Sequence, residues 1–377
     1  MSFSNLGLPQ YLLDALHQNN LQTPYPIQAQ AIPAILDKKD VLGIAKTGSG
    51  KTASFVLPIL ANLESQAKLK DRHIAALVLV PTRELALQVN QVFETFSKAL
   101  PYICKTMAIY GGVSVNVQMK SMSNVSVLIA TPGRLLDLVS SNAVHLGEVK
   151  VFVMDEADKM LNLGFKKELD EIMALLPAKK QNLLFSATLS PNIESIKRVM
   201  LTDPSIIHIA SEENNAELIK QTAYAVSSEK KGPLLRYLIE TQNMQQVLIF
   251  TSSVFQADAV AKKLNHKNIQ AKAIHSNKSQ FARTTALDNF KEGKLRVLVA
   301  TDILSRGIDI KFLPFVINYE LPRSPKDYIH RIGRTGRSEN PGEAIALVTP
   351  DDQHHFNVIQ KKMKVEVKLI DAEELDF

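Results

Sequence analysis

A glycine-rich segment between an apolar run and a helical pattern limits most strongly what this chain can fold into. Residues 41–44 are an apolar run, residues 45–52 read Ala-Lys-Thr-Gly-Ser-Gly-Lys-Thr, and residues 53–63 have a helical pattern. Gly48 and Gly50 let the backbone turn tightly and direct N–H groups at phosphate oxygens, and the helix places its positive dipole end beneath them. The segment therefore predicts a strand, a phosphate-binding loop and a helix.

The residues of this loop fit a nucleoside triphosphate. The usual Gly-x4-Gly-Lys-Ser/Thr pattern is met, except that Ala45 replaces its first glycine. Lys51 would reach the β and γ phosphates, and Thr52 would supply a hydroxyl for Mg²⁺. A plain glycine-rich turn is the alternative, and the register of strand, glycine, lysine, threonine and helix disfavours it.

Acidic residues follow a second apolar run, at residues 151–154, in the order Asp155-Glu156-Ala157-Asp158. We expect Asp155 to hold the same Mg²⁺ and Glu156 to orient or deprotonate the attacking water. Taken alone, such acids are more often a solvated helix start. Beside a phosphate loop, they favour a nucleotide-hydrolysing site.

Composition frames this site without adding to it. The chain has 377 residues, of which 45% are apolar and 22% charged, as in a soluble globular protein of two domains. Its net charge of +6 permits nucleic-acid binding without demonstrating it. Cys104 is the only cysteine, so no disulfide framework or cysteine-rich zinc site is expected. With neither a leader pattern nor an apolar run of bilayer length, we expect a cytoplasmic monomer without a membrane segment.

Aliphatic runs alternate with helical patterns along the chain, which is typical of a parallel sheet covered by helices. The predicted strands are residues 41–44, 74–80, 127–130, 151–154, 247–250, 269–274 and 297–300. The helical patterns between them are residues 53–63, 83–99, 133–139, 165–175, 254–264 and 280–290. A polar stretch at 211–217 breaks the alternation. We therefore predict two doubly wound α/β domains, at 1–209 and 220–377, joined by a linker at 210–219.

The second domain carries a cluster of basic residues at 330–337. Its arginines recur every third residue, as Arg331, Arg334 and Arg337. Two intervening glycines would each cost a helix interior roughly 1 kcal/mol, which disfavours a solvated basic helix. Arginines on a tight turn suit convergence on one anion. If the domains close face to face, that anion is the γ-phosphate held by Lys51, as with an arginine finger.

Eleven segments in one order resemble the motifs of the DEAD-box ATP-dependent RNA helicases, in particular bacterial members with a minimal two-domain core. They are residues 23–28 with upstream Phe3, 45–52, 81–88, 111–112, 131–134, 155–158, 186–188, 248–253, Gln280 with Arg283, 300–310 and 330–337. Together they span nearly the whole chain and leave chance little room. The resemblance implies two tandem RecA-like domains with a nucleotide cleft between them.

The resemblance also implies individual roles. Gln28 would read the adenine edge, Asp309 the ribose, and Lys51 and Thr52 the phosphates and Mg²⁺. The rest of the nucleotide loop is Thr47, Gly48, Ser49 and Gly50. Ser186 and Thr188 would pair with Asp158 and link hydrolysis to domain closure. The fingers would be Arg334 and Arg337, with His330 at the domain interface.

RNA contacts are implied on both domains by the same resemblance. They are Arg83, Gly112, Thr131 and Arg134 on the first, and Arg283, Thr301 and Arg306 on the second. A cap or turn role is the alternative for each, and it is nearly as good for Thr131 and Gly112. The sequence offers no aromatic platform interleaved with basic residues, so we expect sequence-independent contacts to phosphate and sugar.

Two positions near the adenine site depart from the family pattern. Leu21 stands where an aromatic residue usually stacks on adenine, and Tyr25 where threonine is usual. The first implies weaker stacking, for which Tyr25 would compensate if its ring faced the base.

The resemblance implies local unwinding, in which ATP and RNA bind together, closure bends one strand and hydrolysis reopens the domains. Two alternatives stay open. A DNA-directed translocase of the same superfamily is disfavoured by Gln28 and the Asp-Glu-Ala-Asp box. An RNA clamp with little turnover is disfavoured by the presence of Glu156, Arg334 and Arg337.

Overall fold

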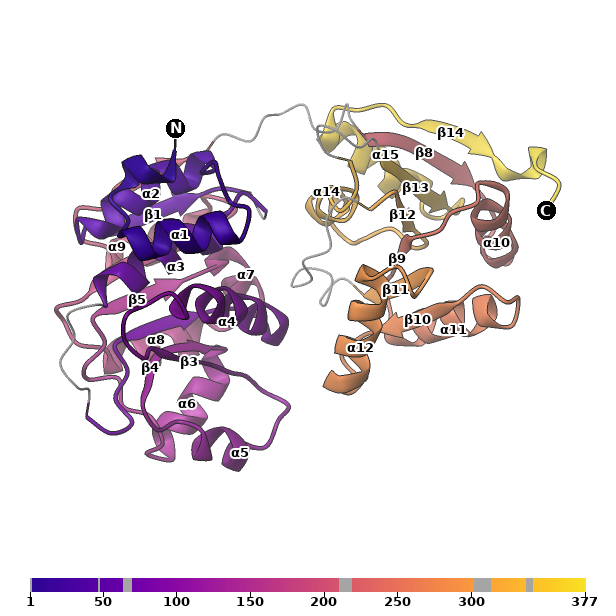
Figure 1. Cartoon of the computed structure of the whole chain (residues 1–377). Coiled ribbons are helices and arrows are strands. Elements are labelled where there is room, and N and C mark those ends of the chain that lie inside the picture. The colour runs from indigo at the N-terminus through magenta and orange to yellow at the C-terminus, as the bar shows by residue number, and fades with distance from the viewer. Residues whose placement is uncertain (1, 47, 64–69, 210–218, 302–312, 337–341) are drawn as a thin grey trace. The chain divides into compact units, whose positions relative to one another are not determined.

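The computed structural model describes residues 2–46, 48–63, 70–209, 219–301, 313–336 and 342–377 (Figure 1). Its contacts divide the chain into two compact units, Met1–Ser211 and Glu212–Phe377, and each unit is described by itself. The predicted linker, 210–219, lies outside the described residues except for its last residue.

The N-terminal unit is an α/β fold. Its strands are β1 (Val41–Ile44), β2 (Ala76–Leu79), β3 (Lys105–Ile109), β4 (Val125–Ala130), β5 (Val151–Met154), β6 (Gln181–Ser186) and β7 (Ser205–His208). Its helices are the 3-10 turn η1 (Phe3–Leu6), α1 (Gln10–Gln18), α2 (Pro26–Leu36), α3 (Lys51–Asn62), α4 (Arg83–Ser97), α5 (Val115–Lys120), α6 (Pro132–Ser140), α7 (Ala157–Asn162), α8 (Lys166–Leu175) and α9 (Pro191–Met200). The described strands form one parallel sheet in the order β3-β4-β2-β5-β6-β1-β7.

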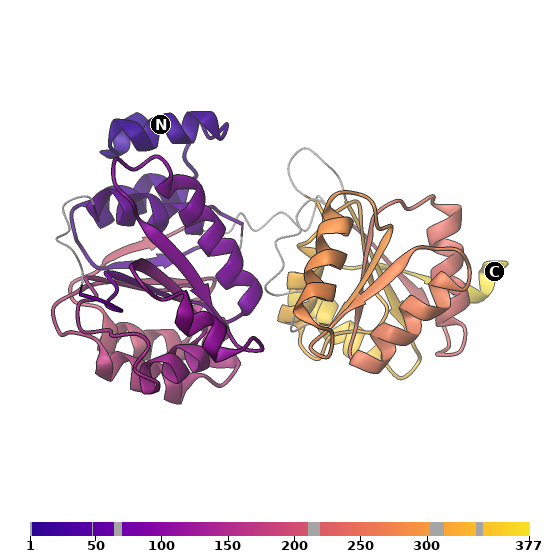
Figure 2. The same cartoon turned by 60° about the horizontal axis from the view of Figure 1, so that its bottom comes forward.

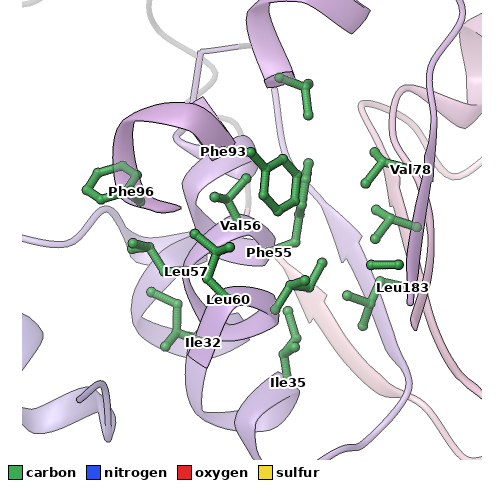
Figure 3. Packing of buried hydrophobic residues seen from close by; sticks show 14 of the residues in the cluster. Ile32, Ile35, Phe55, Val56, Leu57, Leu60, Val78, Phe93, Phe96 and Leu183 are labelled. Carbon is green, nitrogen blue, oxygen red and sulfur yellow. The ribbon is translucent and has the colours of Figure 1, made fainter. Parts of the chain in front are cut away.

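Hydrophobic cores cover both faces of this sheet. Helices α1 to α4 lie on one face and α5 to α9 on the other, because alternate strand residues point to opposite sides. On the first face, Phe55 of α3 packs against Phe93 of α4, with ring centroids 6.4 Å apart (Figure 3). Phe55 also packs against Phe185 of β6, with ring centroids 5.4 Å apart. Each such ring contributes roughly 1.5–3 kcal/mol by burial. The sheet is thereby fixed as a rigid base for the loops at its edge.

The C-terminal unit repeats this architecture. Its strands are β8 (Ile219–Ala225), β9 (Val247–Thr251), β10 (Ala271–Ile274), β11 (Val297–Thr301), β12 (Phe315–Asn318), β13 (Gly342–Val348) and β14 (Lys368–Asp371). Its described helices are α10 (Lys231–Thr241), α11 (Val254–Asn265), α12 (Gln280–Lys291), α14 (Pro325–Ile332), α15 (Gln353–Met363) and the 3-10 turn η3 (Ala372–Glu374). The strands pair in parallel in the order β10-β11-β9-β12-β13-β8-β14. Helices α10 and α11 cover one face, and α12, α14 and α15 the other (Figure 2).

The predicted fold class, two tandem doubly wound α/β domains, is confirmed. The apolar runs at 41–44 and 151–154 are β1 and β5, residue for residue. Strands β3, β6, β7, β8, β12, β13 and β14 were not predicted. Strands β3, β7 and β14 are partly exposed at sheet edges and lack a continuous apolar run, whereas β6, β8, β12 and β13 are interior strands that were overlooked in the sequence. Within the described ranges, no helix is long and apolar enough to cross a membrane.

Candidate functional site

The predicted phosphate loop leads from β1 into α3 at the carboxyl edge of the N-terminal sheet. Gly48 and Gly50 have φ of 87° and 88°, a left-handed backbone that glycine adopts without steric cost. A Cβ built on Gly50 would lie 2.6 Å from Nε2 of Gln28, so the loop has no space for a larger residue there. Thr47 lies outside the described residues.

Lys51 is the first residue of α3 and is buried beside this loop. Its Nζ donates a hydrogen bond to the carbonyl of Ala45 at 2.5 Å, so the ammonium lies across the base of the loop. The buried hydroxyl of Ser49 has no hydrogen-bond partner within the described part of the chain. Such an orphaned group costs roughly 1–3 kcal/mol, and a bound oxyanion would satisfy it.

The acid pair follows β5. Asp155 is 2% exposed, and its Oδ1 accepts the N–H of Glu156 at 2.9 Å. Burial raises the pKa of Asp155 to about 6; the nearby charge of Lys51 opposes this shift and that of Glu156 adds to it. A cation that reaches a buried carboxylate of raised pKa stabilises its ionised form. Its oxygen and the hydroxyl of Thr52 are the hard ligands that Mg²⁺ prefers, so these residues fit the metal.

Glu156 has an unusual backbone. Its φ of 54° is left-handed, a conformation that costs a non-glycine residue of order 1–3 kcal/mol and that is concentrated at functional sites. Its Oε1 forms an ion pair with Nζ of Lys159 at 2.6 Å, while the buried Oε2 has no partner among the residues described. One oxygen is thus held and the other is available to accept a proton. Lys159 was not predicted as part of the site, although its spacing of three residues from Glu156 is the signal of a helical ion pair.

Gln28 connects the phosphate loop to the start of α2. Its Nε2 donates to the carbonyl of Gly50 at 3.1 Å, and its Oε1 accepts the N–H of Tyr25 at 2.9 Å. A Cβ on Gly50 would also meet the ring of Tyr25 at 2.9 Å, so this half-exposed ring lies against the loop. Leu21 is 39% exposed.

The predicted coupling residues meet at the ends of β5 and β6. Asp158 is buried, and its carboxylate accepts a hydrogen bond from the hydroxyl of Thr188 at 3.4 Å and one from the N–H of Ala187 at 3.5 Å. The hydroxyl of Ser186 donates instead to the carbonyl of Thr188 at 2.8 Å. The Ser-Ala-Thr turn is thereby attached to the helix that starts with the acid box.

The predicted RNA contacts of the N-terminal unit fall into two groups. Arg83 and Gly112 lie together, since a Cβ on Gly112 would be 2.8 Å from the Arg83 guanidinium, which lies 5.0 Å from the centre of the Tyr110 ring. Thr131 is the residue before α6, as in the capping alternative, though its side chain makes no cap hydrogen bond. Arg134 is buried and donates to Oε1 of Gln118 at 2.7 Å, which turns it toward the protein.

In the C-terminal unit the basic cluster is divided. Helix α14 ends at Ile332, so Arg331 still belongs to it and is buried, donating to Oδ1 of Asn318 at 2.8 Å. Arg334 follows in the turn and is half-buried, and His330 is half-buried on α14. Of the three arginines, Arg331 therefore has a structural environment that its spacing did not reveal.

Two other predicted RNA contacts of this unit are described. Thr301 is the last residue of β11, and Arg283 lies in the first turn of α12. Three predicted residues of the C-terminal unit lie outside the described ranges: Arg306, Asp309 and Arg337.

Known proteins with similar sequences and structures identify the family of this chain. The family model described as DEAD/DEAH box helicase matches residues 25–196, and the helicase conserved C-terminal domain matches residues 229–339. The DEAD-box ATP-dependent RNA helicase RhpA of Helicobacter pylori is 40% identical over 372 residues, which cover 98% of this chain and 74% of that protein. The DEAD-box ATP-dependent RNA helicase CshA of Bacillus subtilis is 36% identical over 97% of this chain and 73% of its own length.

A solved structure of Dbp5 from S. cerevisiae, bound to RNA and ADP BeF3, matches with a TM-score of 0.83. It is 29% identical and covers 99% of this chain and 96% of that chain. The chain belongs to the DEAD-box ATP-dependent RNA helicases. The predicted family and enzyme class, an RNA-stimulated ATPase, are confirmed.

Proposed function

We propose that the chain unwinds short RNA duplexes locally, by coupling ATP binding and hydrolysis to closure of its two units on single-stranded RNA. The distribution of the predicted site residues between the units supports this proposal. Lys51, Asp155 and Glu156, which are buried beside the phosphate loop, all belong to the N-terminal unit. The predicted RNA contacts, in contrast, are divided between both units. The similarity to Dbp5 bound to RNA and ADP BeF3 supports simultaneous binding of nucleotide and RNA.

In this proposal the loop N–H groups, Ser49 and Lys51 bind the phosphates, and Gln28 fixes the adenine edge. Thr52 and Asp155 would hold Mg²⁺, which when bound neutralises charge on the phosphates. Glu156 orients the attacking water and accepts its proton at Oε2, which has no hydrogen-bond partner within the described ranges. Asp309 would contact the ribose, with Arg334 and Arg337 stabilising the charge of the transferred phosphoryl group.

Both units would bind the RNA through its phosphates and sugars. On the first unit, the contacts would be made by Arg83, Gly112 and Thr131. When the units close, the bound strand bends, and a duplex that cannot follow the bend loses a few base pairs. Asp158 and Thr188 would couple ATP hydrolysis to movement of the units, because their hydrogen bond joins the acid box to the Ser-Ala-Thr turn. His330 would act at the interface between the units.

Glu156→Gln tests the proposal. The amide cannot take a proton from water, so we expect ATP and RNA binding to persist while RNA-stimulated turnover nearly disappears. Labelled single-stranded RNA should then dissociate slowly in the presence of ATP, and a DNA strand of matching sequence should not be retained. Glu156→Asp is the matched control, because it keeps the carboxylate and should keep partial turnover.

Three outcomes would contradict the proposal in different ways. Near wild-type hydrolysis by Glu156→Gln would remove Glu156 as the base. Equal retention of DNA and RNA would favour the DNA-directed translocase. If the wild-type chain binds RNA in the presence of ATP but scarcely hydrolyses the ATP, the chain is the RNA clamp.

A further inference from the structure

Two phenylalanines are almost fully exposed on the C-terminal unit. Phe255 is 81% exposed and Phe281 is 82% exposed, whereas every other phenylalanine within the described ranges is buried or half-buried. Leaving such a ring in water forgoes roughly 1.5–3 kcal/mol of burial. Single exposed apolar residues are common on protein surfaces, but two aromatic rings at related positions suggest a ligand.

Both rings lie at one edge of the C-terminal sheet. Phe255 is in the first turn of α11, which follows β9, and Phe281 is in the first turn of α12, which follows β10. Strands β9 and β10 flank β11 in the parallel sheet, so both helices begin at its carboxyl edge.

An ion pair connects the two helix starts. Asp258, one turn after Phe255, forms an ion pair with Nζ of Lys278 at 2.8 Å, and its other carboxylate oxygen lies 3.0 Å from Nε2 of His275. Lys278 is three residues before Phe281. These contacts hold the segment that carries Phe281 against the first turn of α11, so both rings lie where the starts of the two helices meet, a region that we call the aromatic edge.

The aromatic edge lies at the same edge of the sheet as two predicted RNA contacts. Arg283, like Phe281, is in the first turn of α12, and Thr301 ends β11, which lies between β9 and β10. Aromatic rings interleaved with basic residues are the feature by which proteins bind single-stranded nucleic acid, with bases stacked on the rings. The two exposed rings were not predicted from the sequence, because an apolar residue in a helical pattern is ordinarily assigned to the core.

We propose that Phe255 and Phe281 stack on unpaired bases of the RNA strand whose phosphates bind Arg283 and Thr301. The site rests on the proposed function and adds to it a base-contacting surface. Recognition stays independent of sequence, because every base has a π face. A base that is stacked on protein is also unavailable to its complementary strand, so the aromatic edge would hold bases apart after a duplex opens.

Two labelled RNA strands of equal length test the site in the presence of a non-hydrolysable ATP analogue. One strand is ordinary, and the other keeps its phosphates and riboses but lacks its bases. For Phe255→Ala with Phe281→Ala, we expect the affinity for the ordinary strand to fall about five-fold or more per ring, the lower range for one stacked base. Affinity for the abasic strand should not change. Neither ring is packed, so circular dichroism should show an intact fold.

Matched variants separate stacking from plain apolar contact. Replacing both rings by leucine should weaken binding of the ordinary strand nearly as much as alanine, whereas tyrosine at both positions should preserve it. Ile103→Ala, which removes a 96% exposed side chain from the N-terminal unit, should have no effect. In the wild type, 2-aminopurine placed in the strand should be quenched on binding, and the quenching should be lost with the double alanine variant.

Several results would overturn the proposal. Equal loss on both strands, or full affinity with leucine, would show that the rings do not stack on bases. Unchanged RNA affinity in every variant would leave the surface to a protein partner. Equal wild-type affinity for ordinary and abasic strands would refute stacking alone and leave the proposed function intact. Wild-type failure to bind either strand would refute the proposed function, and the aromatic edge with it.

Discussion

The two units have the same strand order, but among the described residues only the N-terminal unit has the glycine turn and the buried acid pair of the candidate nucleotide site. Counted within its own unit, each strand of the C-terminal sheet has the same neighbours as its counterpart in the N-terminal sheet. Strand β8 therefore corresponds to β1, and β12 to β5. In both units the helix after the first strand begins with a buried lysine, Lys51 in α3 and Lys231 in α10.

The surroundings of the two lysines differ. Lys231 donates to the carbonyl of Tyr319 at 2.9 Å, lies 5.7 Å from the centre of that ring and is 3.8 Å from a carboxylate oxygen of Asp352. Tyr319 and Glu320 follow β12 where Asp155 and Glu156 follow β5.

The oxygen of Glu320 accepts the N–H of Ser252 at 2.6 Å, so this acid is used within the protein. The fold thus supplies the position in both units, but the N-terminal one is distinguished by the left-handed Gly48 and Gly50 and by the oxygens of Ser49 and Glu156 that have no hydrogen-bond partner among the described residues. The topology alone does not make a nucleotide site.

The largest expected effect tests whether the C-terminal unit contributes to hydrolysis despite lacking a phosphate loop. Arg334→Ala should lower the RNA-stimulated kcat by about 10³-fold or more, because an arginine finger contributes 10³ to 10⁵. Arg323→Ala, which removes an exposed arginine from the same unit, is the control. Steady-state ATPase at saturating RNA measures both. If only RNA affinity falls, Arg334 is a backbone contact.

Substitution of the two corresponding lysines, Lys51 and Lys231, tests the comparison of the units directly. Lys51→Met should reduce ATP turnover by about 10²-fold or more, as expected when one donor to developing charge is removed. Lys231→Met should leave kcat and the KM for ATP unchanged, because its ammonium is bound within the C-terminal unit. ATPase assays with thermal unfolding as a fold control decide this. A loss of turnover with Lys231→Met would mean that the two positions remain functionally equivalent.

A smaller effect concerns the free energy of unfolding of the N-terminal unit, which the ionised Asp155 lowers. Since the folded pKa of Asp155, about 6, exceeds its ordinary 3.8, the ionised group destabilises the fold; this cost is absent below pH 3.8 and complete above pH 6. Asp155→Asn should therefore raise the free energy of unfolding by roughly 2–3 kcal/mol at pH 8.

At pH 5 the gain should be smaller, because part of the wild-type group is then protonated in the folded state. Urea unfolding of the metal-free chain at both pH values measures the difference, while ATPase activity should be lost. Equal gains at pH 5 and pH 8 would contradict the assignment of the shift to burial of Asp155.

The smallest effect lies at the rim of the N-terminal site. Leu21→Phe should tighten ATP binding by ~1 kcal/mol or less, the scale of an added stacking contact. Calorimetric titration of wild type, Leu21→Phe and Tyr25→Ala measures it. If Leu21→Phe binds no more tightly, the ring of Tyr25 already occupies that face, as its position against Gly50 suggests.

The sequence by itself determined the fold class and the identity of the nucleotide loop. Both depend on residues near one another in the chain: a buried strand needs a continuous apolar run, as at 41–44, and a phosphate loop needs Gly48, Gly50 and Lys51 in a fixed register. The eleven segments in order identified the family for the same reason, because each is a local pattern.

The tertiary structure decided which side chains meet and which are buried. It placed Arg331 in the interior beside Asn318 and brought Arg83 to Gly112. It also paired one oxygen of Glu156 with Lys159 and left the other without a hydrogen-bond partner in the described part of the chain. Spacing along a chain cannot distinguish a buried arginine from an exposed one, or a core phenylalanine from an exposed one such as Phe281. Burial depends on what other elements pack against each residue, and only the folded chain sets those distances.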